Sequence, residues 1–75
     1  MKIQIRCYAT LAKYQPSSGD EFPVDPGSTV IDVAHGLNIE LEEIKVAFVN
    51  GKHAPLATGL EDGDRVALFP AVGGG

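Results

Sequence analysis

Cysteine is almost absent from this sequence. Cys7 is its only thiol, so the chain cannot close an internal disulfide or supply a metal site built from several cysteines. His35 and His53 have no cysteine or second histidine near them at metal-ligand spacing, and we therefore predict no metal site. Cys7 alternates with Ile3 and Ile5, which indicates a small buried side chain rather than a reactive thiol.

Basic residues and long apolar segments are scarce as well. Six Lys and Arg stand against ten Asp and Glu, for a formal net charge of −4. Phosphate binding requires clustered Lys and Arg, so we expect neither nucleic acid nor an anionic membrane as a partner. No segment approaches the roughly 18 apolar residues of a membrane helix, and no signal peptide precedes the first predicted strand, so we expect a cytoplasmic protein. The acidic surface of the protein either binds a basic surface on a protein partner or serves solubility alone. A solvated acidic turn is expected at Glu40, Glu42 and Glu43.

What the sequence does contain is a pattern of short strands around one helix. Its 75 residues suffice for one domain, and 44% of them are hydrophobic, which is too apolar for a disordered chain. Alternation, apolar runs and flanking turn formers predict five strands, at residues 2–8, 21–24, 45–49, 53–56 and 65–69. Pro23 and Pro55 favour edge positions for the second and fourth strands. Asn50 and Gly51 both tolerate positive φ and predict a tight hairpin between the third and fourth.

One helix is predicted between the second and third strands. Its apolar stripe follows the spacing i, i+3, i+4 and i+7 and consists of Val30, Val33, Ala34 and Leu37. Ser28 or Thr29 is expected to cap the first turn. Asp32 comes three residues after Thr29, close to a capping-box arrangement, in which the later side chain accepts the N–H of the capping residue. Gly36 is expected to end the helix in a left-handed conformation. A single further turn is expected around Leu41.

This order of elements predicts an α+β domain, with a mixed sheet and one main helix packed on one face. Residues 1–70 are expected to form the domain, and residues 71–75 a flexible glycine tail. Such an arrangement is the architecture of ubiquitin-like β-grasp domains.

The tail carries the most informative feature, the sequence Val72-Gly73-Gly74-Gly75 directly after a core strand. Three successive glycines pack nothing and are costly to order, so they do not serve the fold. They do allow the chain end to enter a narrow channel, and they leave the α-carboxylate unhindered. With a reference pKa of about 3.3–3.7 that carboxylate is ionised at neutral pH, and it must be activated before it reacts with a nucleophile. No phosphate-binding loop is present, so we expect no bound cofactor and assign the use of ATP to a partner enzyme.

Four segments in order along the whole chain resemble the MoaD/ThiS family of sulfur carriers. Residues 5–11 are similar to the family's opening strand, and residues 49–52 to its mid-chain hairpin. Residues 60–66 are similar to the turn before its last strand, and residues 68–72 to its signature end. The opening strand looks like that of the molybdopterin-synthase small subunit. The ending departs from the commonest molybdopterin pattern, which has proline at Ala71 and alanine at Gly73.

The resemblance implies a carrier or co-substrate rather than an enzyme. Gly75 then corresponds to the residue that is adenylated and converted to a thiocarboxylate. The residues implied to enter or dock on the partner precede it and are Gly74, Gly73, Val72, Pro70 and Phe69. The implied partners are an E1-like adenylating enzyme and the large subunit of a molybdopterin synthase.

Several functions stay open at this point. Molybdopterin of the molybdenum or tungsten cofactor is the favoured destination of the sulfur, and thiamine thiazole is the alternative. A ubiquitin-like modifier, which joins activated Gly75 to a lysine amine, begins with the same chemistry. An ordinary binding module with an idle tail is the third class. A ferredoxin of the same fold is excluded, because its cluster needs four cysteine ligands.

The resemblance also implies that residues 2–8 and 65–69 run parallel as central neighbours. Alternate residues of the last strand must then point away from the helix, beside Arg6, and these are either Ala67 and Phe69 or Val66 and Leu68. We expect that face to be the rigid docking surface of the protein. Residues 73–75 are expected to be poorly ordered in the free protein, because nothing in them offsets the entropy of ordering.

Overall fold

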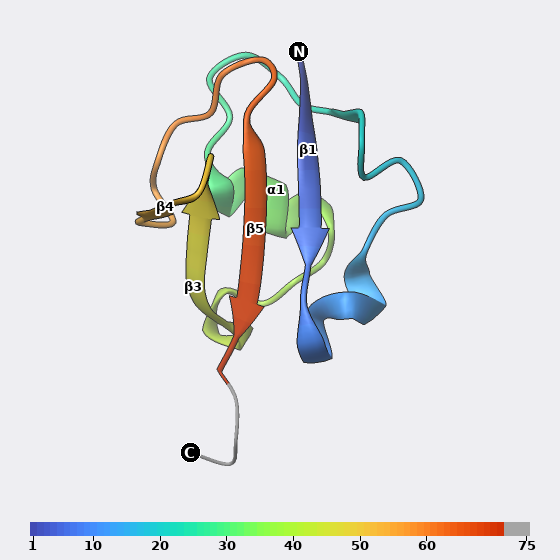
Figure 1. Ribbon diagram of the computed structural model, residues 1–75, viewed down its shortest axis with the longest axis vertical. Helices are drawn as coiled ribbons and strands as arrows, with labels where there is room; N and C mark the ends of the chain where they lie inside the picture. The colour runs from blue at the N-terminus through green and yellow to red at the C-terminus, as the bar shows by residue number, and fades with distance from the viewer. Residues whose placement is uncertain (72–75) are drawn as a thin grey trace.

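The computed structural model describes residues 1–71. One mixed sheet carries the α-helix across one face, and Figure 1 looks onto the other face, with the helix behind the strands. The strands stand in the order β2-β1-β5-β3-β4. Their bounds are β1 Lys2–Cys7, β2 Phe22–Pro23, β3 Ile44–Val49, β4 Lys52–Ala54 and β5 Arg65–Pro70. The α-helix is α1, Val30–Gly36, and two 3-10 helices are η1, Ala9–Tyr14, and η2, Leu41–Glu43. The predicted α+β architecture is confirmed.

The centre of the sheet consists of β1 and β5. They run parallel, with Ile5 opposite Val66 and Cys7 opposite Leu68. Parallel neighbours need a crossover connection, and the segment that contains α1 runs behind the sheet between them (Figure 1). β3 pairs antiparallel with the other side of β5. The predicted central pair is therefore confirmed.

The core lies between the sheet and α1. Ile3, Ile5, Val66 and Leu68 expose 1% of their surface or less, as the alternation of β1 and β5 requires. Full burial of such a side chain contributes about 1.5–3 kcal/mol. The helix adds its predicted apolar stripe from the other side, with Val30, Val33 and Ala34 buried and Leu37 packed against them.

The helix begins and ends where the sequence predicts, but the left-handed residue that follows it is not the predicted one. The Thr29 hydroxyl accepts the Asp32 N–H, and the Asp32 carboxylate accepts the Thr29 N–H, so the capping box is complete. The prediction that the helix ends at Gly36 is confirmed, because Gly36 is the last helical residue. The prediction that Gly36 itself is left-handed is wrong, because the positive φ, 62°, belongs to Asn38. Asn38 is two residues further on and tolerates that conformation.

The edges of the sheet are short, as their prolines predict. β2 ends at Pro23, and β4 starts one residue earlier than predicted and stops before Pro55. Asn50 and Gly51 form the hairpin between β3 and β4 with φ of 53° and 82°. No helix within the described part of the chain, residues 1–71, has the length and apolar character to cross a membrane.

Candidate functional site

The outer face of the sheet, the one that α1 leaves uncovered, includes alternate residues of β5. Val66 and Leu68 are fully buried against the helix, so Ala67 and Phe69 point outward. Of the two predicted pairs, the structure therefore selects the one that contains Phe69. Pro70 is buried in the last position of β5, opposite Ile44, and its predicted part in docking stays a prediction.

Four rings follow one another across this outer face and form what we name the aromatic row: Tyr8, Phe69, Phe48 and His53. Tyr8 stacks on Phe69 with ring centroids 4.6 Å apart and planes 5° apart. Phe48 meets Phe69 edge-on at 5.6 Å, and His53 meets Phe48 edge-on at 6.0 Å. Tyr8, at 43% exposure, is the one large hydrophobic side chain among residues 1–71 that is classed as exposed.

Strand register brings the row together. Phe48 faces His53 across the β3–β4 hairpin and Ala67 across the β3–β5 pairing, and residues directly opposite share a face. The Tyr8 N–H donates to the Leu68 carbonyl at 3.1 Å, which continues the β1–β5 pairing by one residue. Sequence reasoning found Phe69 and missed the other three rings. The hairpin at Asn50 was a sufficient signal for two of them, because a two-residue loop sets Phe48 opposite His53.

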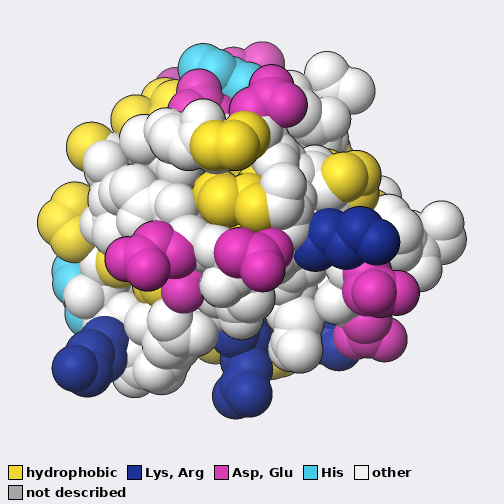
Figure 2. Space-filling model, turned by 90° about the horizontal axis from the view of Figure 1, so that it is seen from above, with side chains coloured by type: hydrophobic (Ala, Val, Ile, Leu, Met, Phe, Trp, Pro, Cys, Tyr) yellow, Lys and Arg dark blue, Asp and Glu magenta, His cyan; other side chains and the backbone are white. Residues whose placement is uncertain are grey.

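Two arginines lie beside the aromatic row, and one of them is paired with a carboxylate. Arg6 on β1 lies opposite Ala67 on β5. Arg65 is two residues before Ala67 on β5, so it belongs to the same face of the sheet as Ala67 and Phe69. The Arg6 guanidinium binds the Asp20 carboxylate, which raises the pKa of Arg6. Figure 2 views the upper end of Figure 1 and shows acidic side chains over that end, with several Lys and Arg side chains along the border formed by the outer face.

Ala71 is the last residue that the structure describes and directly follows β5. The Ala71 N–H donates to the Glu43 carbonyl at 3.3 Å. The Glu43 carboxylate accepts the Tyr14 hydroxyl at 3.0 Å and the Glu40 N–H at 3.3 Å. The hydrogen bond to Glu43 raises the pKa of Tyr14. The acidic turn is thus partly engaged in the fold, since Glu43 ties η1, η2 and the end of β5 together.

The predicted tail residues Val72, Gly73, Gly74 and Gly75 lie outside the described residues. Their predicted roles, and the predicted poor order of residues 73–75, stay predictions. Cys7 is 8% exposed, and burial raises the pKa of its thiol, so its predicted role as a small core residue is confirmed. Within residues 1–71, no three His, Cys, Asp or Glu side chains are grouped so that they could hold a metal ion.

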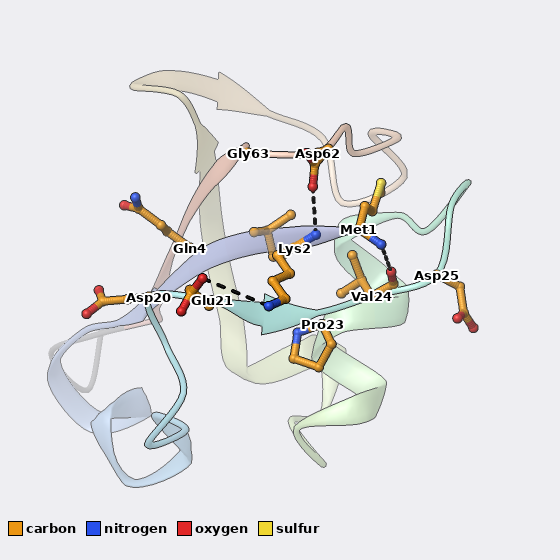
Figure 3. A pocket seen from close by; sticks show the side chains of 11 residues that line it. Met1, Lys2, Gln4, Asp20, Glu21, Pro23, Val24, Asp25, Asp62 and Gly63 are labelled. Atoms are coloured by element: carbon orange, nitrogen blue, oxygen red, sulfur yellow. Dashed lines mark hydrogen bonds and ion pairs between the residues drawn. The ribbon is translucent and has the colours of Figure 1, made fainter.

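A shallow hollow lies beside β1 and β2, and Figure 3 shows its lining. Several of its polar groups bond to one another. The Lys2 N–H donates to Asp62 at 2.8 Å, the terminal amine of Met1 donates to the Val24 carbonyl at 3.0 Å, and the Lys2 ammonium lies 3.9 Å from Glu21. These contacts hold the start of β1 against its neighbours.

A mixed sheet with one helix on one face, and a last strand that leads directly into a glycine tail, define a ubiquitin-like β-grasp carrier or modifier. The chain belongs to the ThiS family, whose model matches residues 5–75. Members of this family are small carriers or modifiers rather than catalysts, and they work with E1-like activating enzymes. The predicted family and the predicted non-enzymatic role are confirmed.

Similar proteins come from the archaeon Haloferax volcanii. Small archaeal modifier protein 3 is 28% identical over 92 aligned residues that cover 100% of both chains. The crystal structure of SAMP1 is 29% identical, has a TM-score of 0.67, and is matched over 100% of both chains. The solution structure of the HVO 2177 protein is 33% identical with a TM-score of 0.72, over 100% of this chain and 87% of that one.

Proposed function

We propose that this protein is a sulfur carrier whose working group is the carboxylate of Gly75. An E1-like partner binds ATP; a carboxylate oxygen of Gly75 attacks the α-phosphorus, pyrophosphate leaves, and an acyl adenylate forms. Sulfur at the oxidation level of hydrosulfide then attacks the acyl carbon and AMP leaves. The product is a thiocarboxylate, with release of the sulfur-bound proton. The carrier itself binds no cofactor in this scheme.

The observation that carries the proposal is the family match, which extends to the last glycine of the chain. We assign the sulfur to the dithiolene of molybdopterin, with the large subunit of a molybdopterin synthase as the second partner. Support for this destination comes from the likeness of the opening strand to the molybdopterin-synthase small subunit. Thiamine thiazole is the alternative destination, because the same thiocarboxylate serves both.

The outer face is the proposed docking surface for the activating enzyme. A flexible peptide alone binds weakly, because ordering it consumes interaction energy. The aromatic row lies beside the point where the tail leaves, since Phe69 comes two residues before Ala71. Aromatic side chains and Arg are enriched at the centres of protein interfaces, and Arg6 and Arg65 flank the row. The partner surface that fits is apolar with a carboxylate opposite Arg65, since Arg6 already binds Asp20.

Intact-protein mass spectrometry on the chain purified from its host tests the chemistry. The expected species has one oxygen replaced by sulfur, and the partner that co-purifies identifies the pathway. Deletion of Gly75 is expected to abolish sulfur transfer and to leave binding to the enzyme nearly unchanged. Formation of a sulfur-accepting adenylate by the deletion variant would show the proposed mechanism to be wrong.

A binding titration with ATP-dependent pyrophosphate exchange tests the docking surface. Phe69→Ala is expected to raise the concentration of carrier needed for half-maximal exchange about tenfold or more, which is the range of interface hot spots. Glu42→Ala, an exposed change on η2, is the control and is expected to leave exchange unchanged. Equal exchange by Phe69→Ala and the parent chain would place the docking surface elsewhere.

Protein modification is the second candidate, and the relative named small archaeal modifier protein 3 favours it. In that function a lysine amine of a target displaces AMP or an enzyme thiol from the activated Gly75, and an isopeptide bond forms. Higher-mass adducts that carry the chain in a host lysate would support modification. Thiocarboxylate without any adduct would assign the chain to sulfur transfer alone.

A further inference from the structure

We propose that Tyr14 and Glu43 form a brace that fixes the point from which the C-terminal tail departs, and that they act as positioning residues in the activation of Gly75. The part of this inference that concerns the activation of Gly75 rests on the proposed function. The other part, the control of Ala71 by the brace, concerns residues that the structure describes.

The brace begins at the side chain of Glu43. One of its oxygens accepts the Tyr14 hydroxyl at 3.0 Å, and the same oxygen accepts the Glu40 N–H at 3.3 Å. These bonds hold Glu43 from η1 and from the start of η2. A hydrogen bond to a carboxylate is about twice as strong as a neutral one, so the turn is held at both ends.

The backbone of Glu43 transmits this restraint to the tail. Its carbonyl accepts the Ala71 N–H at 3.3 Å, which is the last hydrogen bond that the described chain makes before residue 72. Ile44 follows at once and lies opposite Pro70 in the β3–β5 pairing. Since Pro70 has no N–H, the Ala71 bond is the one that extends the end of β5 toward η2.

The position of Ala71 matters because the segment after it is short. Four residues, 72–75, span at most about 14 Å when fully extended. With the sheet docked on the enzyme, release of Ala71 lengthens the free segment by one residue and removes its starting direction. The local concentration of the Gly75 carboxylate at the bound ATP is then expected to fall about two- to fivefold.

Docking and positioning predict different kinetic effects. Tyr14 and Glu43 lie outside the aromatic row, so their loss is expected to lower kcat for adenylation and to leave the KM for the carrier unchanged. Loss of a docking residue such as Phe69 raises KM instead. Glu43→Gln keeps one acceptor oxygen and is expected to recover most of the rate.

The test compares Tyr14→Phe and Glu43→Ala with the parent chain, with Glu42→Ala as the matched control on the same turn. NMR is used to measure the exchange rate of the Ala71 amide in the free protein, and pyrophosphate exchange with the co-purified enzyme gives kcat and KM. The expected result is Ala71 exchange at least about threefold faster in both brace variants, with kcat two- to fivefold lower and KM unchanged. Glu42→Ala is expected to match the parent in every measurement.

Each other outcome has a distinct meaning. Unchanged Ala71 exchange in both brace variants would overturn the brace itself. Faster exchange with unchanged kcat, or with a raised KM, would overturn the positioning role. If the parent chain is not adenylated at all, the proposed function is overturned, and the exchange rates still decide whether the brace controls Ala71.

Discussion

Replacement of Phe69 by alanine removes one ring of the aromatic row. Its effect on the free energy of unfolding can be measured apart from its effect on binding to the partner. A fully buried Phe→Ala change costs about 3–5 kcal/mol. Phe69 is only partly buried and its loss leaves no enclosed cavity, so we expect about 2 kcal/mol. A domain of this size has an unfolding free energy of roughly 4–11 kcal/mol, so the variant remains folded.

Part of that loss belongs to the stacked pair. Tyr8 and Phe69 lie 4.6 Å apart and nearly parallel, and such a pair contributes about 0.5–1.5 kcal/mol beyond the area it buries. A double-mutant cycle with Tyr8→Ala isolates this term, with urea unfolding followed by circular dichroism as the assay. We expect the melting temperature of Phe69→Ala to fall by about 8–16 °C.

The control cycle pairs Phe69→Ala with Thr29→Ala, at the start of α1 and so on the opposite face of the sheet from the aromatic row. These two changes are expected to be additive within about 0.5 kcal/mol. Strict additivity of Tyr8→Ala and Phe69→Ala would refute the stacked geometry. The aromatic row would then not be a rigid surface that a partner can recognise.

Three further outcomes follow from particular contacts. The Gln15 side chain accepts the Cys7 N–H at 2.7 Å and donates to the Ile5 carbonyl at 2.9 Å, so Gln15→Ala is expected to lower stability by about 1–3 kcal/mol in urea unfolding. Gln15→Glu keeps the acceptor but loses the donor to Ile5, and it is expected to recover only part of that loss. Thr29→Ala breaks the capping box and is expected to cost about 1 kcal/mol, with Thr29→Ser near the parent value by the same assay. Because the bond to Glu43 raises the pKa of Tyr14, its contribution to stability is complete below the unfolded pKa of about 10 and is lost as pH rises through the folded value. An NMR titration is expected to show Glu43→Gln lowering that pKa, and an unchanged midpoint would contradict the bond.

Most of the fold was predictable because it depends on local patterns. Alternation along residues 2–8 assigned Ile3, Ile5 and Cys7 to one face, and all three are buried. A capping box needs residues three apart in the sequence, and a two-residue hairpin needs neighbours that tolerate positive φ. Such features are complete within a few residues, so they are readable without the rest of the chain.

One prediction failed for a local reason. Gly36 is the expected left-handed residue by type, yet the chain takes this conformation at Asn38, where the N–H groups of Asn38 and Ile39 donate to the His35 and Ala34 carbonyls at 3.0 and 2.9 Å. The prediction that stayed open depended on contacts between distant segments. The alternation of β5 allowed either Val66 or Phe69 to face outward. The position of α1 on one face of the sheet decides this, because the residues of β5 that face the helix are the buried ones.

The sequence by itself determined the class of this protein, through its strand and helix order and the glycines that end at Gly75. Only the tertiary structure decided which side chains lie near the end of β5. Tyr8, Phe48 and Phe69 come from segments about 20 to 60 residues apart and meet because parallel and antiparallel register align them on one face. Tyr14, Glu43 and Ala71 converge for the same reason, since the packing of η1 and η2 at the end of β5 is set by the whole core rather than by any local pattern.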